Sequence, residues 1–303
     1  MKIQKRSRIC MCISLAIMLI ALVMSLTGHG INYGLDFAGG LTLQFNLDAD
    51  TAVALDMADV TAAVAAQGIT ESNVTISGEG ALRISVPALN TDDEIQQLQE
   101  GLKAALADKY PAIADATATA SYVGPIAGQT LVKNAIWSVV IAAALMLVYI
   151  ALRFDLFSGI AAVVGLLHDV LIMLSFMVLL RSVIQMNSSF IAAMLTIVGY
   201  SINNTIVIFD RIRENNKKPA YAGMKREDVV QKSVKESLGR TINTTLTTLV
   251  TIVALYVLGV DAIRQFSLPI IIGILAGVYS ANLINGYVWA ALEEARLARK
   301  NKA

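Results

Sequence analysis

The sequence predicts an α-helical polytopic membrane protein, with six transmembrane helices and one α+β extracytoplasmic domain. Three observations lead to this fold class. Hydrophobic residues make up 56% of the 303 residues and charged residues only 16%, whereas soluble domains contain about 25% charged residues. Six separate apolar stretches are long enough to cross a bilayer as a helix, which takes about 17 to 25 residues. A long acidic segment separates the first two stretches.

The six apolar stretches are the expected membrane spans, at residues 9–26, 131–152, 156–180, 188–209, 242–258 and 266–292. The alternative for the first stretch is a cleaved signal peptide, because basic residues precede it. Its apolar run is longer than the roughly 7 to 15 residues of a signal-peptide core, and no A-x-A-like cleavage site follows. We therefore expect residues 1–27 to be an N-terminal tail and an uncleaved first helix, and residues 131–292 to carry the other five.

Basic residues in the connections set the expected orientation, because the cytoplasmic loops of membrane proteins are rich in Lys and Arg. Four lie before the first span, nine in the 210–240 loop and four in the tail of residues 293–303, whereas the connections 181–187 and 259–265 hold one each. Six spans place the three basic segments on the same side. We therefore expect both termini and the 210–240 loop to be cytoplasmic.

Residues 28–130 form the expected extracytoplasmic domain, with three basic and thirteen acidic residues. Alternating apolar and polar residues predict strands, and apolar residues at helical spacing predict helices. The expected elements are a strand at 41–47, a helix at 51–67 capped by Thr51, strands at 73–77 and 81–86 around a turn at 78–80, a helix from a cap at Thr91 to 108, and a strand at 116–123. Their order is that of the split βαβ, ferredoxin-like fold, which hosts many functions and names none.

The chain lacks the residue patterns of an enzyme or a metalloprotein. It has two histidines and two cysteines, Cys10 and Cys12, without CxxC or HExxH spacing. There is no nucleophile elbow, and the outer domain has no cysteine and no glycine-rich phosphate loop. We expect no enzyme activity, no catalytic residues, no cofactor and no metal. The net charge of +1 gives no indication of nucleic acid, and we expect no such partner.

Polar residues within the spans are the candidate functional residues, because polar groups at membrane depth are costly and usually face a bundle interior or a water path. The third span has His168 and Asp169 at its midpoint, and the fourth has Asn203 and Asn204 and ends before Asp210. The fifth has one polar face at helical spacing, made of Arg240, Asn243, Thr244, Thr247, Thr248 and Thr251.

These residues predict an ion path, in which polar side chains of the third, fourth and fifth spans converge into a hydrated interior seam shared with a partner subunit. The candidates are Arg240, Asn204, Asp169, His168, Asn203, Asp210 and Thr244. Two alternatives stay open. Hydroxyls and amides often only hold membrane helices together, and an arginine at the cytoplasmic boundary can extend its charge into water.

Several segments together resemble the SecF family, whose members are the smaller partners of SecD in bacterial protein export and belong to the RND superfamily. The segments cover nearly the whole chain in the family's order. The first is the glycine motif Gly34, Leu35, Asp36, Phe37, Ala38, Gly39 and Gly40, and the others are 123–125, 153–154, 167–170, 199–205, 210–215 and 240–244. The glycine motif alone is shared with SecD, but the combined set is specific to the family.

The resemblance implies that the chain is one RND-like half of a twelve-span complex with SecD in the bacterial cell membrane. It also implies that the chain works with the SecYEG channel and the SecA motor. In this role the family uses the transmembrane gradient of H⁺ or Na⁺ to promote late translocation of exported unfolded polypeptides, which contact its outer domain while its helices lie in the lipid bilayer.

One position departs from the family pattern. Arg240 matches the family's arginine in the fifth span, but Asn204 stands where many relatives have an acid. An amide cannot carry the proton, although its oxygen can bind a hard cation such as Na⁺. Three possibilities follow: sodium coupling, a proton-carrying carboxylate on the partner, or loss of coupling. The last favours an alternative function, a non-conducting structural assembly subunit that stabilises a SecD-like partner.

Overall fold

The computed structural model describes residues 3–69, 72–76, 80–87 and 92–300. The chain divides into two compact units, residues 1–32 with 135–303, and residues 33–134. The first unit is helical and the second combines helices with a sheet.

Six stretches of the described chain are helical, long and apolar enough to cross a membrane, as the sequence predicts. A helix satisfies its own backbone hydrogen bonds, which is why apolar runs of this length can enter lipid. The first five are α1 (Ile3–Leu26), α7 (Pro125–Arg153), α8 (Leu156–Leu179), α9 (Ser188–Asn216) and α10 (Arg226–Leu258). The sixth runs through α11 (Asp261–Ser280), the π-helical η2 (Ala281–Asn285) and α12 (Gly286–Lys300).

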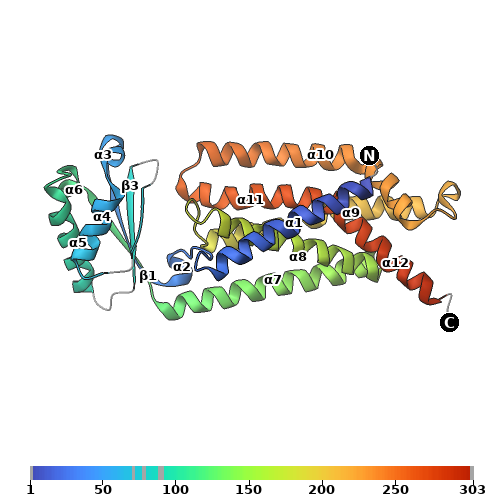
Figure 1. Ribbon diagram of the computed structural model, residues 1–303, viewed down its shortest axis with the longest axis horizontal. Helices are drawn as coiled ribbons and strands as arrows, with labels where there is room; N and C mark the ends of the chain where they lie inside the picture. Colours follow the sequence, from blue (N-terminus) through green and yellow to red (C-terminus); the bar gives the residue numbers. More distant parts are fainter. Residues whose placement is uncertain (1–2, 70–71, 77–79, 88–91, 301–303) are drawn as a thin grey trace. The chain divides into compact units, whose positions relative to one another are not determined.

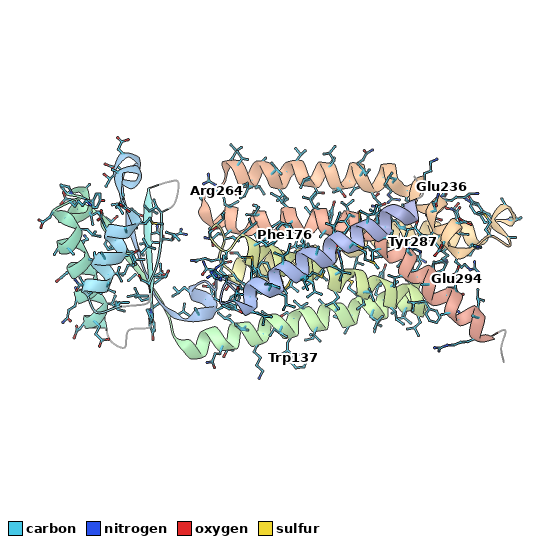
Figure 2. The ribbon with its side chains drawn as sticks, in the orientation of Figure 1. Trp137, Phe176, Glu236, Arg264, Tyr287 and Glu294 are labelled. Atoms are coloured by element: carbon cyan, nitrogen blue, oxygen red, sulfur yellow. The ribbon has the colours of Figure 1, made fainter. Side chains whose placement is uncertain are left out.

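The centre of the helical unit is formed by α8, α9 and α11. About half of the apolar part of α8 and α9 is buried, against 11% in α1, α7 and α10. Figure 1 shows α10 alongside α11, and Figure 2 shows Trp137 of α7 directed away from the bundle, where 56% of it is exposed. The outer helices thus present apolar surface in the manner of helices that face lipid.

Close approach of α9 and α11 depends on two glycines. A Cβ atom at Gly273 would lie 2.5 Å from Ile197, and one at Gly277 would lie 3.2 Å from Ser201. Small residues let membrane helices pack closely, since apolar side chains gain little by leaving lipid for a protein interior. The glycines therefore set the position of Ser201 relative to α11.

The 210–240 connection, expected as a loop, is mostly helical. α9 continues to Asn216, α10 begins at Arg226, and the 3₁₀ helix η1 (Pro219–Tyr221) lies between them. The carboxylate of Glu236 joins these elements, accepting hydrogen bonds from Arg211 Nε at 2.6 Å, Asn215 Nδ2 at 2.8 Å and the Tyr221 hydroxyl at 3.0 Å. The hydropathy pattern ended the helices too early, because Arg, Lys and Glu are good helix formers outside the bilayer.

The second unit contains a four-stranded antiparallel sheet in the order β2-β3-β1-β4. Its strands are β1 (Gly40–Asn46), β2 (Asn73–Ile76), β3 (Ala81–Val86) and β4 (Thr117–Val123). Its helices are α2 (Leu35–Ala38), α3 (Ala49–Ala54), α4 (Met57–Ala66), α5 (Asp92–Ala107) and α6 (Ala112–Asp115). With β1 between β3 and β4, this is the predicted split βαβ, ferredoxin-like arrangement.

The core of this unit follows from strand alternation. Every second residue of β1 and β3 points to one face of the sheet. On that face Leu41, Leu43, Phe45, Leu82 and Ile84 have no exposed area and form one cluster with Val60 and Val64 of α4 and Leu98 and Leu102 of α5. The apolar sides of the two helices therefore close the domain.

The predicted helix at 51–67 is wrong in detail, because the chain forms two helices there. Asp48 caps α3 by accepting a hydrogen bond from the Thr51 backbone N–H at 2.7 Å, and Asp56 caps α4 through the Ala58 N–H at 2.9 Å. Thr51 is therefore not the cap. Residues 78–79 of the expected turn and the expected cap at Thr91 lie outside the described residues, and α6 was not predicted.

A polar cluster joins α4 to the chain after α5 and predicts a pH-dependent contribution to stability. Asp59 Oδ2 accepts hydrogen bonds from Lys109 Nζ at 2.5 Å and the Tyr110 hydroxyl at 2.6 Å. These donors lower the pKa of Asp59 below its ordinary value. A lowered folded-state pKa stabilises the fold above the unfolded pKa of about 3.9, and this stabilisation is lost as the pH falls through the folded value.

We therefore expect Asp59→Asn to speed hydrogen exchange of the β1 amides at about pH 7 but not at about pH 2.5, each compared with the unmodified chain at the same pH. Asp108→Asn is the matched control, since it removes an exposed carboxylate beside Lys109 and should change little. An equal effect of Asp59→Asn at both pH values would contradict the prediction.

Candidate functional site

A buried polar cluster in the helical unit is centred on Asp169 of α8, whose side chain has no exposed area. Its Oδ1 lies 2.9 Å from His168 Nδ1. Its Oδ2 accepts hydrogen bonds from the hydroxyls of Ser201 on α9 at 2.5 Å and Ser280 on α11 at 2.9 Å. A buried carboxylate is costly unless it is paired or hydrogen-bonded, and here three helices supply its partners.

His168 continues this cluster toward the first helix. Its Nε2 lies 2.8 Å from the Tyr279 hydroxyl, and the two rings meet edge to face with centroids 5.2 Å apart. The Tyr279 hydroxyl lies 2.6 Å from Ser14 Oγ on α1, which can donate to the Cys10 carbonyl at 3.0 Å. We call Ser14, His168, Asp169, Ser201, Tyr279 and Ser280 the α8 cluster. It joins α1, α8, α9 and α11.

A cavity of about 310 Å³ borders the α1 end of the α8 cluster. Ser14 and Tyr279 line it together with apolar side chains of α1, α8 and α11, among them Phe176 (Figure 2). Cys10 also lines it. The lining of the cavity is almost wholly apolar, so the cavity borders the cluster mainly through carbon atoms.

Asn204, which the resemblance places at an acidic position of the family, is buried with 1% of its surface exposed. Within the described residues its Nδ2 has no hydrogen-bond partner. The next residue, Thr205, accepts a hydrogen bond from Asn285 Nδ2 of η2 at 2.8 Å. An unpaired buried donor costs about 1–3 kcal/mol, and π-helical segments are frequent at functional sites. This region is therefore a polar interior that a water molecule or another acceptor would stabilise.

The polar face of α10 points away from the bundle. Its exposed residues, which we call the outward stripe, are Arg240, Asn243, Thr244, Thr247 and Thr251. Their neighbours Thr241 and Thr245 are buried, and the Thr241 hydroxyl lies 3.3 Å from Asn282 Oδ1. The Thr247 and Thr251 hydroxyls donate to carbonyls one turn back in α10. The costly group is Arg240, because a charge directed at lipid requires water or another polar surface against it.

The register between α9 and α10 extends this polar surface to the neighbouring helix. The two helices are antiparallel and joined by hydrogen bonds from Asn215 to Ser233 and from Arg211 to Glu236. Both helices rise by the same distance per residue. Continuing this pairing along the two helices therefore places Asn203 of α9 level with Thr244 of α10. Asn203 and Asp210 of α9 are exposed, as Thr244 is.

The glycine motif at residues 34–40 shapes the turn from α2 into β1. Leu35 and Asp36 form the first turn of α2, Phe37 is buried, and Gly34 precedes the helix. Gly39 and Gly40 have φ of +70° and +124°, a region that side chains disfavour. A Cβ atom at Gly128 would lie 2.8 Å from the Phe37 carbonyl oxygen. Because Gly128 has no side chain, the start of α7 can pack directly on the backbone of α2.

The structure separates the candidate residues into two polar regions. His168 and Asp169 lie together in the α8 cluster, with partners from α1, α9 and α11. Arg240 and Thr244 lie on the outward stripe, and Asn203 and Asp210 on the exposed face of α9, whereas Asn204 is buried. The single interior seam expected from the sequence is thus divided, and α10 contributes none of the hydrogen bonds to Asp169 given above.

Four residues of the α8 cluster were not predicted: Ser14, Ser201, Tyr279 and Ser280. The first and last spans were judged by their apolar content alone. A signal was present in the last span, where Tyr279 and Ser280 are followed by Asn282 and Asn285 at helical spacing. Four polar residues on neighbouring turns of an apolar span indicate an interior polar face.

Comparison with known proteins gives consistent matches along the chain. The family model of the SecD/SecF protein export membrane protein C-terminal region matches residues 103–295, and that of the SecD/SecF GG motif matches residues 25–51. The chain is 34% identical to the protein translocase subunit SecF of Sebaldella termitidis, over 94% of this chain and 88% of that protein. It is 37% identical to the SecF subunit of Thermodesulfovibrio yellowstonii, over 82% and 80% of the two chains.

A solved structure agrees with these matches. The crystal structure of SecDF, a translocon-associated membrane protein from Thermus thermophilus, is similar with a TM-score of 0.81 and 31% identity. The match covers 96% of this chain and 38% of the SecDF chain. The chain therefore spans less than half the length of that protein.

Proposed function

The chain belongs to the SecD/SecF family of protein export membrane proteins, and we propose that it pairs with SecD and uses the transmembrane gradient of H⁺ or Na⁺ to promote late translocation of secreted polypeptides. It is a multi-pass membrane protein that matches the SecF translocase subunits along most of its length. The pairing and the use of the gradient are the proposal.

The outward stripe is the observation that carries the proposal. A permanently charged guanidinium, an amide and three hydroxyls occupy one exposed side of a membrane-spanning helix. Lipid cannot solvate these groups. The Thr247 and Thr251 hydroxyls already donate to backbone carbonyls of α10, so a polar surface of SecD would act mainly on Arg240, whose charge a carboxylate there would offset. Water between two such surfaces would give an ion a route through the membrane.

We further propose the bacterial cell membrane as the location, with both termini and the 210–240 segment in the cytoplasm. The concentration of Lys and Arg in these segments supports this orientation. The subunit would act beside the SecYEG channel and the SecA motor without enzyme activity of its own. Exported unfolded polypeptides would contact the acidic outer domain while the helices remain in the lipid bilayer.

One observation favours a second function, that of a non-conducting assembly subunit which stabilises SecD. Asn204 has no group that takes up or releases a proton near neutral pH, and it stands where many relatives have an acid. If proton coupling depended on that position alone, this chain would contribute only helix packing.

The deciding experiment measures export in membrane vesicles that contain this chain, SecD, SecYEG and SecA, with the proton and sodium gradients collapsed separately. We expect collapse of one gradient to reduce the export rate to that of vesicles without this chain. Collapse of the other gradient is the internal control and should have little effect. Export that declines equally with and without the chain, whichever gradient is removed, would contradict gradient use and support the assembly subunit.

A further inference from the structure

The hydrogen bonds of the α8 cluster form a continuous path whose donors can be assigned atom by atom. A carbonyl oxygen only accepts, so the contact between Ser14 and the Cys10 carbonyl requires Ser14 to donate. Ser14 Oγ then accepts from the Tyr279 hydroxyl, and the Tyr279 oxygen accepts from His168 Nε2. In this arrangement Nε2 carries a proton.

This first arrangement requires one more proton between His168 and Asp169. With Nε2 protonated, a neutral imidazole would present a bare Nδ1 to an ionised carboxylate 2.9 Å away, two acceptors facing each other. The contact is favourable only if Nδ1 and Oδ1 share a proton, either as imidazolium with carboxylate or as imidazole with carboxylic acid. The pair then has no net charge.

A second arrangement satisfies the same atoms with one proton fewer. Ser14 donates to the Tyr279 oxygen, Tyr279 donates to a bare His168 Nε2, and Nδ1–H donates to an ionised Asp169. The carboxylate then accepts from Nδ1 and from the hydroxyls of Ser201 and Ser280. These three hydrogen-bond donors stabilise the ionised form of the buried carboxylate. Only the Ser14 hydrogen bond to the Cys10 carbonyl is given up.

We propose that His168 and Asp169 form a binding site for one exchangeable proton, connected by hydrogen bonds through Tyr279 to Ser14 on α1. On release, the Nε2 proton passes to the Tyr279 oxygen and the Tyr279 proton passes to Ser14 Oγ. The Ser14 proton leaves the Cys10 carbonyl and passes to a water molecule that reaches Ser14. Each oxygen gains one proton and loses one. The net charge of the His168–Asp169 pair changes from zero to −1.

The surroundings of the pair leave this charge change uncompensated. α9 contributes the Ser201 hydroxyl, α11 contributes the Ser280 and Tyr279 hydroxyls, and α1 contributes Ser14 and the thiol of Cys10, which lines the cavity. The cation Arg240 is exposed on the outward stripe of α10 and makes none of the hydrogen bonds given above for this cluster. A proton bound at the pair therefore alters the charge of the bundle interior by one unit.

This site supplies within the chain the proton-binding group that Asn204 cannot provide. The inference rests on the proposed use of an ion gradient for its role, but the binding site itself stands on the hydrogen-bond geometry. Its titration needs neither SecD nor a gradient. The site can therefore fail its test while export still follows a gradient, and it can pass while export does not.

The test is a pH titration of the full-length chain in lipid nanodiscs, labelled with ¹⁵N at histidine and followed by NMR. The chain has two histidines, and the second, His29, is exposed and serves as the internal reference. We expect His168 to lose the Nε2 proton as the pH rises and to keep the Nδ1 proton. A protonated Nε2 throughout, or no change between about pH 4 and pH 10, would overturn the proposal.

A second measurement tests the path without removing the pair. Tyr279→Phe deletes the linking hydroxyl, so proton release after a pH jump should become at least about tenfold slower. The control is Tyr287→Phe (Figure 2), since within the described residues the buried Tyr287 hydroxyl has no hydrogen-bond partner. Unchanged release kinetics in Tyr279→Phe would contradict the path through Tyr279, and equal slowing in both variants would assign the effect to packing.

Discussion

Replacing Gly165 with valine is expected to disrupt the helical unit. A Cβ atom at this position of α8 would lie 2.0 Å from Asn285 Oδ1 and 2.4 Å from Nδ2. Asn285 cannot simply move away, because its Nδ2 donates to the buried Thr205 hydroxyl. Overpacking of a filled interior costs about 1–3 kcal/mol, and a broken buried hydrogen bond adds a cost of similar size. Gel filtration of the detergent-solubilised chain should show loss of most of the monodisperse protein.

Two further variants test whether the effect comes from the contact between position 165 and Asn285. Gly199→Val introduces the same side chain into α9, where a Cβ atom would meet nothing within 4 Å, and should leave the elution profile nearly unchanged. Asn285→Ala removes the atoms that collide, so the double variant Gly165→Val with Asn285→Ala should recover part of the loss. If Gly165→Val were as stable as Gly199→Val, the close packing of α8 on η2 would be refuted.

The membrane spans and the order of elements in the outer domain could be predicted because each depends on a local pattern. An apolar run of sufficient length identifies a membrane helix wherever its neighbours lie. The strand alternation in 41–47 and 81–86 likewise identifies the buried face of the sheet. These signals are repeated at many residues, so a single polar substitution does not hide them.

The candidate site was harder to predict because helical spacing identifies a polar face but not what it faces. Arg240 and Thr244 share a face with regular spacing, yet that face points out of the bundle, whereas Thr241 and Thr245 beside it are buried. Asp169 accepts hydrogen bonds from Ser201 and Ser280, which lie 32 and 111 residues away in the sequence. Such pairing depends on how α8, α9 and α11 pack, which no local pattern encodes.

Arg240→Gln is expected to reduce gradient-stimulated export at least about tenfold while SecD still copurifies with the chain. Arginine remains charged at any physiological pH, so in the outward stripe it fixes one positive charge beside the proposed partner surface. Glutamine keeps a hydrogen-bonding side chain of similar length but removes that charge. The measurement is the export rate in vesicles with the gradient present and collapsed, together with the amount of SecD recovered with the chain.

Lys235→Gln provides the matched control, because Lys235 is an exposed cation on the same helix, near the segment that joins α10 to α9. It should export normally, which would separate the position of the charge from the total charge of the helix. Arg240→Lys should retain part of the activity, since a point charge replaces a planar donor group.

The two proposed functions predict opposite results for Arg240→Gln. An assembly subunit needs only the packing surface, so full export by Arg240→Gln with SecD still bound would reject ion coupling through the outward stripe. Loss of export together with loss of SecD would instead mean that the charge serves pairing.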